Sequence, residues 1–235
     1  MLKKTVMGKI ATILGVMALA AGVASAGFAS SSESSLTPDQ ALQKLMDGNK
    51  SYVENRMTVT QRSDQATRAS LAKSQKPYAV ILTCSDSRVP PEVIFDKGLG
   101  EIFVIRVAGN VPDPIILGSI EYAAEHLGSP LVMVLGHERC GAVTATVDAK
   151  GKTTGSSNID AIVKTIDPAV KTAHKKCHST NKSELVECAA DINAKNVAAS
   201  LTKNSKILKH LVAEKKLKIV VAKYDLDDGV VSLFK

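Results

Sequence analysis

The chain has 235 residues, of which 45% are hydrophobic and 23% charged, with four cysteines and no tryptophan. This composition is typical of a globular protein and excludes collagen, a coiled coil and wholesale disorder. A domain of this length buries a sufficient core without a disulfide framework, so each cysteine has to be interpreted individually.

The first 26 residues have the pattern of an export signal. Three lysines flank an apolar run at 10–23, and Ala24-Ser25-Ala26 is the small-residue pattern that signal peptidases cleave. The apolar run is too short to span a bilayer. We therefore predict a signal peptide over 1–26 and a periplasmic or secreted mature protein that is not held in a membrane. The alternative is an uncleaved anchor.

The net charge of +7 gives little support to a nucleic-acid partner. Without the three lysines of the predicted signal, 27 basic residues stand against 23 acidic ones, which leaves +4. The whole chain has only eight aromatic residues, and none of them alternate with basic residues as in single-strand binding surfaces. We therefore predict no nucleic-acid partner.

The predicted structure begins with an N-terminal helical arm. Residues 27–36 are rich in serine without periodicity and indicate a disordered linker. Thr37 as N-cap and Pro38 at the first helical position then open an amphipathic helix. Its apolar face comprises Ala41, Leu42, Leu45, Met46, Tyr52 and Val53.

Short apolar runs that alternate with helical patterns predict an α/β domain over 37–235, with a mostly parallel β-sheet flanked by helices. Continuous apolar runs suit strands that are buried on both faces. A helix with Asp113 as N-cap and its end at Gly128 separates the second and third runs. The segment 150–206 is polar and predicts two or three surface helices within the same domain. The four runs lie at 78–83, 102–106, 131–136 and 217–224.

Two of these strands lead directly into residues that can bind a metal. CSDSR at 84–88 follows the first strand, and GHERCG at 136–141 ends the third. Both motifs fall where an α/β sheet places its ligands, at the carboxyl ends of its strands. Spacings of two and of three turn the side chains within each motif to one side. Two thiolates, an imidazole and a carboxylate suffice for tetrahedral zinc: Cys84, His137, Cys140 and Asp86.

The aspartate decides whether such a site is open. If Arg88 holds Asp86 through charge-assisted hydrogen bonds, Zn²⁺ keeps three protein ligands and one free position. Water bound there loses a proton near neutral pH and becomes a hydroxide nucleophile, which Asp86 would orient. If Asp86 binds the metal instead, the site is closed and inactive.

These motifs resemble the β-class carbonic anhydrases. The resemblance rests on CSDSRVPPE at 84–92 and GHERCGAV at 136–143, and it extends through LMDGNKSYV, RVAGNV, SIEYAAEHLG and LKIVVAKYDLDDGVV. It implies reversible hydration of carbon dioxide to bicarbonate and a proton, with zinc on Cys84, His137 and Cys140. It also implies that Asp86 and Arg88 form the catalytic dyad.

The resemblance further implies a substrate cleft that is completed across a dimer interface, in a homodimer or a larger assembly of dimers. The residues that match the lining of this cleft by position are Gln75, Phe103, Tyr122 and Gly141.

One departure concerns regulation. A branch of the family carries a tryptophan three residues before its first zinc cysteine and uses it, with an arginine and a tyrosine, to bind bicarbonate allosterically. This chain has Ile81 at that position, although Arg106 matches the arginine. We therefore predict that the chain belongs to the branch without this pocket.

Two cysteines remain, both in the polar segment. In an exported protein, Cys177 and Cys188 are predicted to form a disulfide that clips this segment. The rival interpretation is a second metal site made of His174, Cys177 and His178.

Two other functions compete with carbon dioxide hydration. The first is hydrolysis of carbonyl sulfide or carbon disulfide at the same metal, which differs mainly in access to the cleft. The second is a zinc-holding or bicarbonate-binding module without catalysis, which predicts loss of the Asp-Arg pair. Both Asp86 and Arg88 are present.

Overall fold

A computed structural model describes residues 36–177 and 181–234. The predicted signal peptide and all of the predicted linker except Leu36 lie outside the described residues. Leu36 is partly buried and packs against a hydrophobic core. Among the described helices, none is long and apolar enough to cross a membrane.

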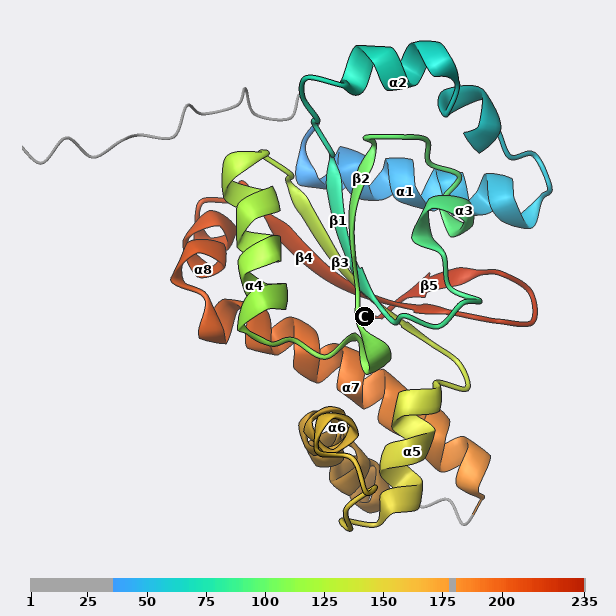
Figure 1. The fold of residues 1–235 in the computed structure, drawn as a ribbon, viewed down its shortest axis with the longest axis vertical. Helices are drawn as coiled ribbons and strands as arrows, with labels where there is room; N and C mark the ends of the chain where they lie inside the picture. Colours follow the sequence, from blue (N-terminus) through green and yellow to red (C-terminus); the bar gives the residue numbers. More distant parts are fainter. Residues whose placement is uncertain (1–35, 178–180, 235) are drawn as a thin grey trace, which may run out of the picture.

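The centre of the domain is a five-stranded sheet with the order β2-β1-β3-β4-β5 (Figure 1). The first four strands are mutually parallel, and only β5 runs antiparallel to its neighbour β4. This confirms the predicted mostly parallel sheet. The short β5 was not predicted, because three residues after a turn carry no periodicity. The strands are β1 (Ala79–Thr83), β2 (Ile102–Arg106), β3 (Leu131–His137), β4 (Lys218–Tyr224) and β5 (Val231–Leu233).

One face of the sheet is covered by α1 (Pro38–Val53) and α3 (Pro91–Ile94). Helix α1 begins as predicted, with a capping box in which the Thr37 hydroxyl accepts from the Gln40 amide N–H at 3.2 Å. The side-chain amide of its buried Asn49 donates to the carbonyl oxygens of Ile94 at 3.2 Å and Gly229 at 2.9 Å, which joins the arm to α3 and to the chain that precedes β5. The short helices η1 (Val59–Arg62) and α2 (Gln65–Leu71) connect this arm to β1.

The opposite face is covered by α4 (Pro114–Glu121), the π-helical turn η3 (Tyr122–His126), the second half of α7 (Lys182–Asn204) and α8 (Lys206–Ala213). The residues facing them from β1 and β3 alternate with those that face α1, and all are fully buried. This two-sided burial explains why the central strands are continuous apolar runs.

A third core lies beyond the carboxyl ends of the strands. Helices α5 (Gly141–Ala149) and α6 (Ser157–Lys176) gather there around the first half of α7, below the sheet in Figure 1. The prediction of surface helices for 150–206 was therefore wrong for α7, in which nine residues are buried, and incomplete for α6, which buries five. As predicted, Cys177 at the end of α6 is paired with Cys188 of α7, with 6.6 Å between their Cα atoms.

Candidate metal centre

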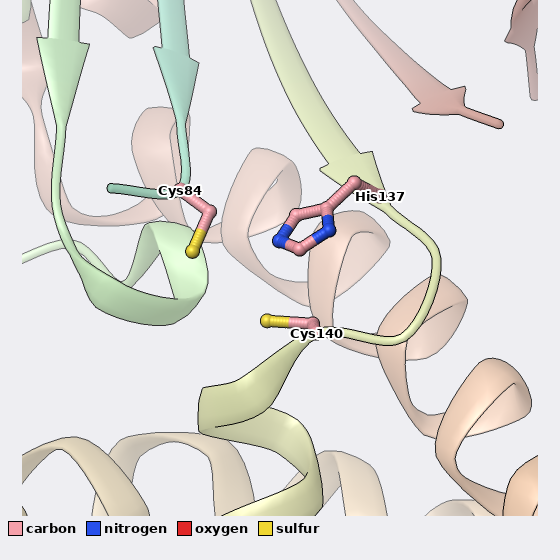
Figure 2. Close-up of side chains that lie close together, drawn as sticks. All are labelled: Cys84, His137 and Cys140. Carbon is pink, nitrogen blue, oxygen red and sulfur yellow. The ribbon is translucent and has the colours of Figure 1, made fainter. Parts of the chain in front are cut away.

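Three potential metal ligands converge where β1 and β3 end (Figure 2). Cys84 directly follows β1, His137 is the last residue of β3, and Cys140 is the N-cap of α5. Because β1 and β3 are adjacent parallel strands, their ends bring both motifs to one edge of the sheet. One ligand atom from each residue lies within 4.8 Å of the others, and all three side chains are buried.

The ring of His137 is oriented for ligation through one nitrogen. Its Nδ1 lies 2.8 Å from the carbonyl oxygen of Glu138, so this nitrogen carries the proton and donates it. The other nitrogen, Nε2, is buried and has no hydrogen-bond partner among the described residues. A buried nitrogen with a free lone pair, beside two thiols, is what a bound metal ion would satisfy.

The two thiols lie close together, with their sulfur atoms within 4.8 Å of each other. Contact with Cys140 lowers the pKa of Cys84, as does the Gly109 N–H, whereas contact with Cys84 and burial raise the pKa of Cys140. A divalent cation that bound both sulfurs would displace their protons. This donor set of two sulfurs and one imidazole nitrogen fits zinc.

Asp86 is held away from this cluster by Arg88. The guanidinium donates from Nε to Oδ1 at 2.9 Å and from Nη2 to Oδ2 at 2.8 Å, and the Arg88 amide also donates to Oδ1 at 3.0 Å. These hydrogen bonds from Arg88 hold the pKa of Asp86 well below its usual range. Of the two arrangements considered from the sequence, these hydrogen bonds correspond to the one in which Arg88 holds Asp86.

Arg106 hydrogen-bonds to the backbone of the loop that carries Cys84 and Asp86. Its Nε donates to the Cys84 carbonyl at 3.0 Å and its Nη2 donates to the Asp86 carbonyl at 2.5 Å. Arg106 was considered in the sequence only for its match to an allosteric arginine. Sequence reasoning missed this contact, because it depends on the pairing of Arg106 with Thr83 in the sheet, which the sequence does not show.

The four predicted cleft residues are dispersed within one chain. Gly141 begins α5, directly after Cys140, and is exposed. Phe103 and Tyr122 lie together, with 6.4 Å between their ring centroids, but Phe103 pairs with Val80 near the opposite end of the strands from Cys84. Gln75 precedes β1 and is exposed. Only Gly141 is therefore adjacent to the ligands of its own chain.

Two other candidate metal groups do not extend this centre. Glu138, Asp225 and Asp227 come close together, but Asp227 is engaged by the Arg139 guanidinium at 2.9 and 3.0 Å. In the rival site of the polar segment, Cys177 is used by the disulfide, and His178 lies outside the described residues.

Comparisons with known proteins identify the family of this chain. The sequence model of the carbonic anhydrase family matches residues 79–231. Carbonic anhydrase 2 of Mycobacterium tuberculosis is 39% identical over 82% of this chain and 90% of its own length. The carbonic anhydrase of Mycolicibacterium smegmatis is 38% identical over 83% of this chain and 93% of its own length.

Solved structures show the same fold. The β-carbonic anhydrase CafA of Aspergillus fumigatus superimposes with a TM-score of 0.66 at 25% identity, covering 83% of this chain and 90% of that one. A β-carbonic anhydrase of Coccomyxa, solved with acetazolamide, gives a TM-score of 0.67 at 23% identity, covering 82% of this chain and 86% of that one. Sequence and fold agree over most of the chain, which therefore belongs to the β-carbonic anhydrase family.

Proposed function

We propose that this chain catalyses the reversible hydration of carbon dioxide to bicarbonate and a proton, with zinc bound by Cys84, His137 and Cys140. The observation that carries the proposal is the position of Asp86. Its carboxylate is held by two hydrogen bonds from the Arg88 guanidinium, beside three buried donor atoms that could bind zinc. With Asp86 so held, a bound zinc would have three protein ligands, which supports a catalytic rather than a structural site.

The chain's own residues would prepare water for attack. Zinc, when bound, supplies the Lewis acidity that lets water lose a proton near neutral pH. Asp86 stays ionised because Arg88 lowers its pKa, so its carboxylate can only accept a hydrogen bond. It therefore orients the water oxygen toward carbon dioxide. Arg88 keeps the same carboxylate from taking the free position itself.

A dimer would give the dispersed cleft residues a role. Strand β2 lies at the edge of the sheet, and the neighbouring Ile115 and Tyr122 are 79% and 48% exposed. An association through this edge would place Phe103, Tyr122 and Gln75 against a second copy rather than their own metal centre. A homodimer, alone or as the unit of a tetramer, is accordingly part of the proposal.

The absence of allosteric bicarbonate binding is also part of the proposal. The Arg106 guanidinium is already bound to the Cys84 and Asp86 carbonyls, and Ile81 is fully buried. A hyperbolic response of the rate to bicarbonate is expected. A crystal soaked in bicarbonate that held the ion beside Arg106 would contradict it.

For the N-terminal region, we propose export and cleavage after Ala26, on the sequence pattern alone. The mature enzyme, 27–235, would then be periplasmic or secreted. Expression of the full gene in a bacterium, followed by intact-mass measurement of the exported protein, tests this. A mass that includes residues 1–26 would support an uncleaved anchor.

The central experiment is stopped-flow hydration of carbon dioxide by the zinc-loaded mature protein across a range of pH. Asp86→Ala and Cys140→Ser are measured alongside, with Ser87→Ala as a control, because Ser87 lies between Asp86 and Arg88 with an exposed side chain. The rate should rise with pH, vanish in Cys140→Ser together with zinc, and fall about 10²-fold or more in Asp86→Ala while zinc stays bound. Ser87→Ala should match the wild type.

A zinc-loaded wild type without hydration activity at any pH would overturn the proposal. Release of sulfide from carbonyl sulfide or carbon disulfide by that same protein would then establish the alternative substrates. Absence of both activities would establish a binding module.

A further inference from the structure

We propose that helix α7 is a brace for the metal centre, in which Glu187 and Asn193 are positioning residues for the two segments that carry the metal ligands. The inference rests on the proposed function only for the identity of the metal. It gives a role to the polar segment, to which neither the motifs nor the family resemblance assigned one.

The first contact supports the Cys84 side of the centre. Asn193 is 3% exposed, and its Nδ2 donates to the carbonyl oxygen of Gly109 at 3.0 Å. The N–H of the same glycine donates to the Sγ of Cys84 at 3.3 Å. Gly109 belongs to η2 (Ala108–Asn110) and has a positive φ of 69°, which turns its N–H and C=O to different partners. Asn193 thus holds the peptide that holds the cysteine sulfur.

The second contact supports the loop from His137 to Cys140. The Arg139 amide, between these two ligands, donates to Glu187 Oε1 at 2.7 Å. Arg139 has a positive φ of 49°, which a non-glycine residue adopts only when its surroundings impose it. The other carboxylate oxygen of Glu187 is 2.8 Å from the Nζ of Lys223 on β4, so the acceptor is itself fixed. This amide bond therefore specifies the turn that sets the distance between His137 and Cys140.

The helix that carries both residues is rigidly placed. Its buried stripe includes Leu185, Val186, Ala189 and Ala190, which share one hydrophobic core with Cys84 and Cys140. Ala194 approaches β3 so closely that a Cβ added to Gly136 would lie 3.2 Å from the Ala194 methyl carbon. Cys188, the residue after Glu187, is bonded to Cys177 of α6. A brace needs such an anchor, because a mobile helix could not fix a turn.

The expected consequence concerns how tightly the metal is held. Groups that orient metal ligands typically cost 10- to 100-fold in metal affinity when removed, because the ligands then have to be ordered on binding. Loss of either contact should therefore loosen one of the two segments that carry the metal ligands, although the three ligands themselves are unchanged.

The test compares substitutions on the same helix by the rate at which zinc is lost from the mature protein to excess chelator. Glu187→Ala removes the acceptor, whereas Glu187→Gln keeps an oxygen at the same place. Asp191→Ala is the matched control, because Asp191 also pairs with Lys223, at 3.1 Å, but does not accept from the loop. For Asn193→Ala the control is Asn196→Ala, an exposed asparagine on the same helix.

We expect zinc release to be about tenfold faster or more in Glu187→Ala and Asn193→Ala, and to stay within about threefold of wild type in Glu187→Gln and both controls. Hydrogen exchange of the Arg139 amide should accelerate in Glu187→Ala but not in Asp191→Ala. If Asn193→Ala does not fold, the Glu187 series decides alone.

The inference would be overturned if Glu187→Ala released zinc at the wild-type rate, or if Asp191→Ala released zinc as fast as Glu187→Ala. In either case α7 would contribute only general stability. Fast release in Glu187→Gln would show that the charge, not the acceptor, matters, and would overturn it too. Zinc release can be measured whether or not the protein hydrates carbon dioxide. A wild type that holds zinc without hydrating carbon dioxide would therefore refute the proposed function, and the zinc-release experiment would still test the role of α7. A wild type that takes up no zinc refutes both.

Discussion

The two strand-end motifs and the polar segment over 150–206 contribute to one metal centre in very different ways. The motifs supply all three candidate ligands from chain that directly follows or ends a buried strand. The described part of the polar segment supplies none of these three ligands, yet α7 hydrogen-bonds to Gly109 and to Arg139, beside them. A site can therefore depend as much on chain that carries no chemical motif as on chain that does.

The difference follows from how each region encodes its place. The motifs depend on residue type and short spacing, which are visible in the sequence. Helix α7 depends on a stripe of alanines that lets it approach the sheet closely, as the contact between Ala194 and Gly136 shows. Alanine is only weakly hydrophobic. The sequence of a helix with a buried stripe of alanines is therefore hard to distinguish from that of an exposed polar helix.

The largest expected effect tests whether α6 is a polar surface helix or part of the core. Ile166 is fully buried in the core shared with Cys84 and Cys140, so Ile166→Ala should lower the free energy of unfolding by about 2–5 kcal/mol. Ile159 lies on the same helix and is 48% exposed, so Ile159→Ala should change the free energy of unfolding by no more than about 0.5 kcal/mol. Urea unfolding of both variants checks this. Equal effects would mean that α6 does not contribute to the core.

These two regions also differ in how much of their structure could be predicted from the sequence. The order of elements, the parallel strands and the metal cluster were predictable, because buried strands and metal ligands have strong local patterns. The contacts of Arg106, Glu187 and Asn193 were not, since each joins positions far apart in the chain. Asn193 and Gly109, for example, are 84 residues apart, and only the packing of α7 brings them together.

The second effect concerns the disulfide that anchors the brace. Replacing both Cys177 and Cys188 by serine should lower the free energy of unfolding by about 2–3 kcal/mol at most, because the closed loop is short. Reductant should destabilise the wild type but leave the double variant unchanged. Unfolded, unreduced, metal-free wild type should expose two reactive thiols, those of Cys84 and Cys140. Four reactive thiols would contradict the pairing.

A smaller effect tests the contact between the two regions at Gly109. Its φ of 69° makes Gly109→Ala strained by about 1–2 kcal/mol. The new methyl carbon would also lie 2.6 Å from Ile166 Cδ1, the far end of a side chain that can shift. Ile166→Val removes that atom, so Gly109→Ala should cost less in the Ile166→Val background. Additive losses of unfolding free energy in the double variant would show that α6 does not press on this turn.

The smallest effect sharpens the comparison within the polar segment, through pH. Burial raises the pKa of Asp191 on α7, despite Lys223, whereas side-chain hydrogen bonds from Thr153 and contacts with Thr154 lower the pKa of Asp160 on α6. A raised folded-state pKa means that the contribution of Asp191 to stability falls as pH rises from the unfolded value, about 4, through the folded value.

For Asp160 the sign is opposite: its contribution is complete above about pH 4 and is lost only as pH falls through its lower folded value. The unfolding free energy of Asp191→Asn minus that of wild type should therefore rise with pH from about pH 4 upward, and that of Asp160→Asn should fall with rising pH below it. Metal-free protein is used throughout, so that loss of zinc at acid pH does not enter the difference. Parallel slopes for the two variants would mean that α7 is as solvated as α6 at these positions, and would weaken the case for α7 as a packed brace.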